Sequence, residues 1–148
     1  MIFITVGTTA FDSLIQAVDE ISLAINKKII CQIADGNYIP TQCEYFRFKP
    51  TIEKEFRDAE LIICHGGAGT LFKLLELRKK VIAVPNLERS DKHQSDLIDT
   101  LSAGNYIISC YKLSDLKDKI LDIGKADLKK YEQPKCSIAE EIIKFIDR

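Results

Sequence analysis

Apolar residues recur along the chain in two alternating patterns, which predict strands separated by helices. Short runs rich in β-branched residues predict six strands, at residues 2–6, 28–33, 45–48, 61–64, 81–84 and 106–109. Apolar stripes at helical spacing predict helices over about residues 14–25, 50–59, 71–77, 91–102, 113–123 and 137–147. Continuous apolar strands between helices are typical of a parallel sheet that is buried on both faces. The predicted fold class is α/β, a Rossmann-like three-layer domain with a parallel sheet.

Length and charge narrow the range of functions. The 148 residues, 46% of them hydrophobic, predict one domain over residues 1–148 with a single core. A net charge of −1 gives no basis for bulk attraction to nucleic acid, so no nucleic-acid partner is expected. The first residues are too short a run for a signal-peptide core, and no apolar span of about 20 residues occurs. We expect a cytoplasmic chain that reaches a membrane only through a partner.

The cysteines do not indicate a disulfide or a zinc site. Five are present, an odd number without C-x-x-C spacing, at positions 31, 43, 64, 110 and 136. Those at 31, 64 and 110 lie in apolar runs, where a thiol packs as a small hydrophobic group. We therefore expect reduced thiols, and neither a metal nor a cofactor is predicted.

The segment from Cys64 to Thr70 is the strongest candidate for a binding site. It reads Cys-His-Gly-Gly-Ala-Gly-Thr between an apolar strand and a helical pattern. Glycines allow a ligand to approach the backbone, and the N–H groups at the start of a helix attract anions. The segment lacks the lysine and spacing of a P-loop and the spacing of a dinucleotide fingerprint. Tight packing of strand against helix would account for one glycine, so three glycines beside a histidine favour phosphate binding.

Two further segments are expected near this loop. Gly7, Thr8 and Thr9 follow the first strand, where they form either a plain turn or an additional set of phosphate donors. Ser90 to Gln94 follow the fifth strand, and they are either a solvated first turn or a set of donors and acceptors for sugar hydroxyls. Loops at the carboxyl ends of parallel strands line one crevice, which favours the binding interpretation for both.

These motifs together resemble the family-28 glycosyltransferase C-terminal domain. The resemblance rests on Val6–Asp12, Asp58–Thr70, Val84-Pro85-Asn86 and the pair His93-Gln94, in order over about residues 1–110. More narrowly, the chain resembles the small subunits of divided transferases, which act on dolichol-linked sugars in eukaryotes and in capsule or exopolysaccharide synthesis in bacteria. The resemblance implies the C-terminal half of a GT-B enzyme. It also implies inverting, metal-independent transfer from a UDP-sugar to a lipid-linked acceptor held by a membrane-anchored partner subunit.

The resemblance also implies roles for individual residues. The diphosphate would contact the loop and helix start and the first turn, and the departing diphosphate would be stabilised chiefly by His65, Gly66 and Gly67. His65 would either donate to phosphate or only anchor the loop. Phe48 and Lys49 match the uracil-binding segment, and His93 and Gln94 match the contacts to the donor sugar. The complete set implied for the donor is Gly7, Thr8, Thr9, Phe48, Lys49, His65, Gly66, Gly67, Ala68, Gly69, Thr70, Glu76, His93 and Gln94. No residue is expected to act as a base, because in this family the acceptor is activated largely by the other half.

Lys73 departs from the pattern of the family. The resemblance implies a glutamate there that accepts hydrogen bonds from ribose, whereas a lysine cannot accept one. Three outcomes stay open: donor affinity is weakened, Glu76 one turn later compensates in part, or the chain has lost donor binding. Residues 77–80, Leu-Arg-Lys-Lys, also depart from a common Gly-Lys-Pro, and we interpret this change as tolerated in a solvated loop.

The predicted last helix, 137–147, has an apolar stripe formed by Ile138, Ile142, Phe145 and Ile146. It packs on its own sheet or docks on a partner subunit. Three functions remain open: a donor-binding transferase subunit active only with its partner, a non-catalytic enhancer or scaffold of such an enzyme, and a stand-alone nucleotide-binding module.

Overall fold

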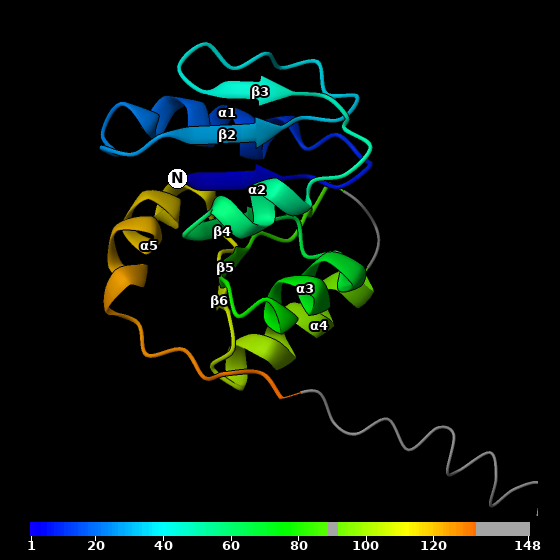
Figure 1. The fold of residues 1–148 in the computed structure, drawn as a ribbon, viewed down its shortest axis with the longest axis vertical. Coiled ribbons are helices and arrows are strands. Elements are labelled where there is room, and N and C mark those ends of the chain that lie inside the picture. Colours follow the sequence, from blue (N-terminus) through cyan, green and yellow to red (C-terminus); the bar gives the residue numbers. More distant parts are fainter. Residues whose placement is uncertain (89–91, 133–148) are drawn as a thin grey trace, which may run out of the picture.

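A computed structural model describes residues 1–88 and 92–132, with the side chains of Lys92 and His93 excepted, and its chain forms one sheet flanked by helices (Figure 1). The strands are β1 (Ile2–Thr5), β2 (Ile29–Gln32), β3 (Glu44–Phe46), β4 (Leu61–Cys64), β5 (Lys80–Ala83) and β6 (Ile108–Ser109). The helices are α1 (Asp12–Ser22), α2 (Glu53–Asp58), α3 (Ala68–Glu76), α4 (Lys92–Ala103) and α5 (Leu116–Asp122). Short 3₁₀ turns flank α5 at Leu113–Asp115 and Ile123–Lys125.

All neighbouring strands run parallel, in the order β3-β2-β1-β4-β5-β6. The register is continuous across the centre, where Ile2 pairs with Leu61 and Thr5 with Cys64. Successive strands are added first on one side of β1 and then, from β4 onward, on the other. This is the strand order of a doubly wound Rossmann fold, so the predicted fold class is confirmed.

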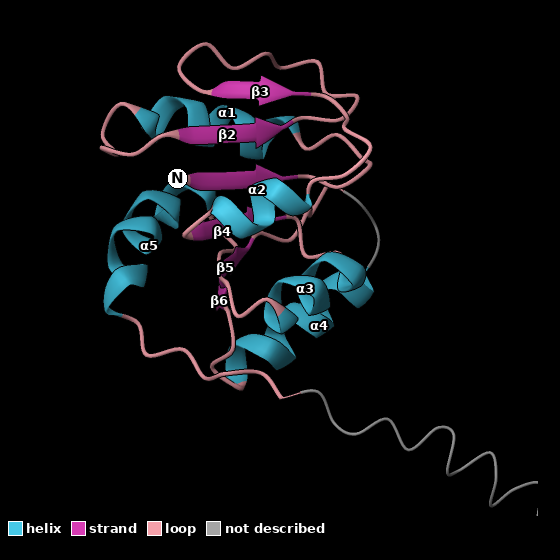
Figure 2. Ribbon diagram, viewed as in Figure 1, coloured by secondary structure: helices cyan, strands magenta, loops and turns pink. Residues whose placement is uncertain are grey.

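Helices cover both faces of the sheet, which explains the continuous apolar strands (Figure 2). Ile4 and Ile63 point to the face covered by α1 and α5, where they join a core with Leu14. Phe3 and Ile62 point to the opposite face and its core under α2, α3 and α4. Alternate residues of one strand therefore fill two separate cores. None of the described helices is long and apolar enough to span a membrane.

Every strand and helix predicted within the described residues is present, but the ends of several differ from the prediction. Ser13 and Gln16 have the spacing of a capping box, which predicts Ser13 as the N-cap of the first helix. This prediction is wrong, because Phe11 stands at the N-cap and Ser13 lies inside α1. The strand predicted over residues 106–109 starts only at Ile108, because the N–H of Tyr106 bonds back to Leu101 of α4. Likewise, α2 starts at Glu53 rather than at residue 50. The predicted helix 137–147 and its apolar stripe lie outside the described residues.

A buried carboxylate fixes the long connection from β2 to β3. Asp19, on α1, accepts hydrogen bonds from the N–H groups of Thr41, Gln42 and Cys43 and from the hydroxyls of Tyr38 and Thr41. Burial alone would raise the pKa of Asp19, but these hydrogen bonds outweigh it and hold the pKa below its usual value. The ionised carboxylate therefore stabilises the fold.

Replacing Asp19 by Asn should lower the free energy of unfolding at neutral pH by about 2–3 kcal/mol, because the amide opposes N–H donors with a donor of its own. Since the folded-state pKa is depressed, the carboxylate's contribution is complete above the unfolded pKa of about 3.9 and is lost as the pH falls through the folded pKa. Urea titrations at several pH values should show a steeper acid loss in the wild type than in Asp19→Asn. Asp118→Asn, at an exposed position of α5, is the control; an equal effect there would contradict the assignment.

Candidate functional site

The candidate site lies where the order of the sheet reverses, between β1 and β4. These strands pair in parallel, so the turns that follow Thr5 and Cys64 leave the sheet side by side. In Figure 1 both turns are at the end of the sheet to which the strand arrows point. The fold thus brings both turns to the carboxyl ends of these two strands, which is where doubly wound sheets bind their ligands.

Buried hydrogen bonds fix the turn after β1. Thr5 is buried, and its hydroxyl donates to Oε1 of Gln32 at 2.6 Å. The same hydroxyl accepts the N–H of Gly7 at 3.2 Å. Gly7 has a φ of 68°, in the region that favours glycine, so its chain reverses sharply there. The next residue, Thr8, is exposed, and Thr9 is half-buried.

The imidazole of His65 lies between the two turns. A Cβ added to Gly7 would be 2.7 Å from Cε1 of this ring, and a Cβ added to Gly67 would be 2.7 Å from Nε2. Both distances are far below van der Waals contact, so the ring packs directly on the two glycine backbones. His65 therefore joins the turn after β1 to the turn after β4, a contact that the sequence did not reveal.

Packing explains more of the glycines than the sequence indicated. Gly66 has a φ of 88°, and a Cβ there would lie 2.4 Å from Cδ1 of Ile98 on α4. Gly67 must be small because of His65. Two of the three glycines thus have internal steric reasons, rather than one, whereas a Cβ on Gly69 would meet nothing within 4 Å. Gly69 is the glycine that leaves a helix start open to a ligand.

The N-terminus of α3 offers unsatisfied donors to this open space. Gly67 is the N-cap, its side chain is absent by nature, and no side chain caps the helix. The first N–H groups of a helix have no partner within the helix, and here these belong to Ala68, Gly69 and Thr70. Ala68 and Gly69 are exposed, and the first turn contains no acidic residue. The arrangement is suited to binding an anion such as a diphosphate.

Cys64 is not a nucleophile. Burial raises the pKa of its thiol to about 12, although a hydrogen bond with the backbone of Gly66 acts in the opposite direction. The thiol is therefore protonated at neutral pH and packs as a hydrophobic group. Among residues 1–88 and 92–132, no three His, Cys, Asp or Glu side chains form a group that could hold a metal ion.

The loop after β5 approaches the start of α1. Oδ1 of Asn86, a buried side chain, accepts the N–H of Glu88 at 3.2 Å. Oε1 of Glu88 accepts the hydroxyl of Ser13 at 3.1 Å. The loop after β5 is thus hydrogen-bonded to α1, the helix that follows the turn at Gly7. Gln94, in the first turn of α4, is half-buried, and the side chain of His93 lies outside the described residues.

The segment predicted to read the base follows β3, at the same edge of the sheet. Phe48 is 53% exposed. Lys49 forms an ion pair with Glu55, and its ammonium lies 4.2 Å from the centroid of the Phe46 ring. Burial would raise the pKa of Glu55, yet Lys49 holds it below its usual value. Lys49 is therefore engaged within the chain, and Phe48 is the side chain open to a ligand.

Lys73 has a partner that the sequence did not reveal. Its ammonium lies 3.5 Å from Oε1 of Glu53 on α2, and both side chains are largely exposed. Only the packing of α2 beside α3 brings the two together, so no local sequence signal identifies the pair. Glu76 is the last residue of α3, about 12 Å along the axis from Ala68 by the rise of a helix. It lies farther from the glycine loop than Lys73 does.

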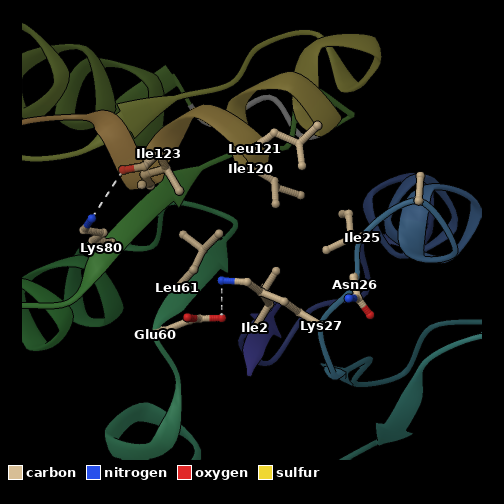
Figure 3. A pocket seen from close by; sticks show the side chains of 12 residues that line it. Ile2, Ile25, Asn26, Lys27, Glu60, Leu61, Lys80, Ile120, Leu121 and Ile123 are labelled. Carbon is tan, nitrogen blue, oxygen red and sulfur yellow. Dashed lines mark hydrogen bonds and ion pairs between the residues drawn. The ribbon is translucent and has the colours of Figure 1, made fainter.

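A cavity of about 470 Å³ lies at the opposite end of the sheet, at the amino ends of the strands (Figure 3). It is bounded by the starts of β1, β4 and β5 and by side chains such as Ile25, Ile120 and Leu121. The ammonium of Lys27 pairs with Glu60 at 2.7 Å at its rim. None of the predicted site residues lines it, so it is separate from the crevice.

Comparison with known proteins agrees with this geometry. The family model of the glycosyltransferase family 28 C-terminal domain matches residues 1–148. The chain belongs to this family.

Named relatives of this family 28 domain are subunits of transferases. The human UDP-N-acetylglucosamine transferase subunit ALG13 is 32% identical over 123 residues, which are 74% of this chain and 11% of the human protein. The subunit ALG13 of Debaryomyces hansenii is 30% identical over 99 residues, 64% of this chain and 47% of that protein. The chain thus spans about a tenth of the human relative and about half of the fungal one.

Solved structures show the same fold. Acinetobacter baumannii MurG superposes with a TM-score of 0.73 at 17% identity, over 99% of this chain and 49% of MurG. The solution structure of ALG13 gives a TM-score of 0.62 at 19% identity, over 95% of this chain and 93% of that one. The family 28 domain is therefore a Rossmann-like unit that corresponds to half of a GT-B glycosyltransferase.

Alanine substitutions at two glycines should act in opposite directions. Gly66→Ala should lower the free energy of unfolding by about 2–4 kcal/mol, because the positive φ is strained and the methyl meets Ile98. Gly69→Ala should raise it by about 0.5–1 kcal/mol, because its methyl occupies open space on a helix. Denaturant titrations of both variants measure these changes. Equal destabilisation by the two would contradict the packing described here.

Proposed function

We propose that this chain is the donor-binding part of a divided, inverting glycosyltransferase that uses a UDP-sugar. The observation that carries the proposal is the open N-terminus of α3 at the reversal point of the sheet, with no side-chain cap and no acid in its first turn. The site suits a diphosphate. The names of the ALG13 relatives support UDP-N-acetylglucosamine as the donor.

The acceptor is proposed to be bound by another protein domain. The chain aligns with about half of MurG, and family 28 C-terminal domains match all 148 residues. We assign acceptor binding to a membrane-anchored subunit that holds a lipid-linked acceptor, and we place this chain in the cytoplasm at the membrane surface. Polysaccharide or glycolipid synthesis is the corresponding role, with no metal or cofactor required.

In this mechanism the chain binds and orients the donor and stabilises the departing diphosphate. The N–H groups of Ala68, Gly69 and Thr70 would meet the charge that develops on the leaving group, without a covalent intermediate. His65, which packs on both Gly7 and Gly67, would hold the two turns together, so that both act on one diphosphate. The backbone near Phe48 would read the base, and His93 and Gln94 would contact the sugar.

Gly69→Asp should weaken donor binding strongly while preserving the fold. The side chain enters open space, and a carboxylate in the first turn of a helix is favourable for the helix itself. The same charge would repel a diphosphate, so calorimetric titration with UDP and UDP-N-acetylglucosamine should show at least a tenfold loss of affinity.

Gly69→Asn is the matched control, with the same shape and no charge. It should retain most of the affinity and most of the transferase activity measured with the acceptor-binding partner. Wild-type affinity in Gly69→Asp would overturn the proposed diphosphate position. Absence of UDP-sugar binding by the wild type, alone and with the partner, would overturn the proposed function.

A non-catalytic enhancer subunit is the second candidate, and the Lys73–Glu53 pair is the observation that favours it. An ammonium stands where the family resemblance implies a carboxylate that holds the ribose. If this chain has lost donor binding, neither Gly69→Asp nor Gly69→Asn should change the activity of the assembled transferase.

Exchanging the two charges tests this candidate directly. The double variant Glu53→Lys, Lys73→Glu keeps the exposed ion pair and places a hydrogen-bond acceptor on α3. For a donor-binding subunit, UDP affinity should rise about tenfold, the effect of one hydrogen bond to a charged group. The double variant Glu53→Gln, Lys73→Gln is the neutral control. A chain that fails to bind UDP in all three forms would favour the enhancer.

A further inference from the structure

A concentration of positive charge lies near the amino ends of the strands, at the end of the sheet opposite the glycine loop. A pocket of about 300 Å³ is lined there by Arg78, Lys79, Lys80, Lys129 and Lys130, with Asp127 as its one acidic residue. It adjoins the start of β5, whereas the glycine loop follows the end of β4. The whole chain carries a net charge of −1, so this excess of positive charge is local.

The positive charges in this pocket are not neutralised within the described part of the chain. None of the ion pairs among described residues includes any of the five basic side chains. The ammonium of Lys79 donates to the carbonyl oxygens of Arg57 and Ala59 at 2.6 and 2.9 Å. That of Lys80 donates to the carbonyl oxygen of Ile123 at 3.4 Å (Figure 3). These bonds fix the two ammonium groups while their charge remains.

Arg78 occupies a backbone position that disfavours it. Its φ is 55°, just after the end of α3, where its N–H bonds to the carbonyl of Leu75 and the N–H of Lys79 bonds to that of Leu74. Glycine or asparagine is usual at such a helix end, because the left-handed conformation costs other residues about 1–2 kcal/mol. A guanidinium is therefore present there at a cost to stability.

Ring contacts and hydrogen bonds hold residues 127–131, which form another part of the pocket lining. Tyr131 packs edge-on against Tyr106, with centroids 5.5 Å apart, and lies 5.9 Å from the ring of Phe72. Asn105 donates to the carbonyl of Asp127 at 2.7 Å and accepts the N–H of Lys129 at 2.9 Å. These contacts hold the segment that carries Lys129 and Lys130 against the fold, and the half-buried Tyr106 and Tyr131 line the same pocket as Arg78.

We infer that this basic pocket binds the phosphate group of a ligand other than the nucleotide sugar. Guanidinium and ammonium groups are the side chains that recognise phosphate oxygens, and the pocket, at about 300 Å³, is large enough for one phosphate group. The headgroup of an anionic lipid and a soluble phosphate ester share this chemistry. The inference is independent of the donor site, because the pocket adjoins the amino end of β5 and the glycine loop lies at the carboxyl end of the neighbouring β4.

Arg78→Gly separates the binding role from folding. Glycine relieves the strained φ, so the variant should unfold at a temperature raised by about 2–4 °C. It should nevertheless bind phosphate about fivefold more weakly, the effect of one basic group near an anionic surface. The double variant Lys129→Gln, Lys130→Gln should weaken binding further, and Lys117→Gln, an exposed lysine of α5 outside the pocket, should bind as the wild type does.

Two assays with the full chain distinguish the sources of the phosphate. One is co-sedimentation with phosphatidylcholine vesicles with and without phosphatidylserine, and the other is an NMR titration with inorganic phosphate that follows Tyr106 and Tyr131. Binding in either assay that weakens in Arg78→Gly and with added salt supports the inference, and the responding assay identifies the source. The inference is overturned if the wild type binds in neither assay, or if Arg78→Gly and the double variant bind as tightly as Lys117→Gln does.

Discussion

The parallel pairing of β1 with β4 is the constraint on which the site depends. Since Thr5 lies opposite Cys64, the chain leaves both strands at the same level and in the same direction. Gly7 and Gly67, sixty residues apart in the sequence, then both pack against the imidazole ring of His65. A shift of this register would separate the two turns, and the turn at Gly7 would no longer lie beside the N-terminus of α3.

The glycine loop has two requirements, which are met by different residues. Gly66 and Gly67 allow the chain to pass close to Ile98 and His65, so they build the loop. A Cβ added to Gly69 would meet nothing within 4 Å, so this glycine leaves the first N–H groups of α3 accessible. A glycine-rich segment therefore combines packing and binding, and the sequence alone does not divide these roles among its members.

Much of the fold could be predicted because the strands are buried on both faces. Leu61–Cys64 is apolar at every position, and its bounds agree with the prediction. Errors occur where a tertiary contact decides the outcome. Ser13 has the chemistry of a helix cap, yet its hydroxyl bonds to Glu88, 75 residues away. Tyr106 has high strand propensity, but its N–H completes the end of α4.

The site shows the same division. Its loops could be located because glycine and polar residues follow apolar strands, and parallel strands bring those loops to one edge. The contact of His65 with Gly7, the pairing of Lys73 with Glu53 and the positive φ of Arg78 depend on packing between distant segments. None of these three leaves a periodic pattern in the sequence.

The most direct test of the central claim is a residue-resolved NMR titration of the chain with UDP-N-acetylglucosamine. The diphosphate should shift the backbone amide signals of Gly7 to Thr9 and of Gly66 to Thr70, where the two turns and the start of α3 converge. Signals of residues 24–27 and 120–124, which line the cavity at the opposite end of the sheet, should remain unchanged. Saturable shifts confined to that cavity, with the glycine loop unaffected, would contradict the proposed donor site.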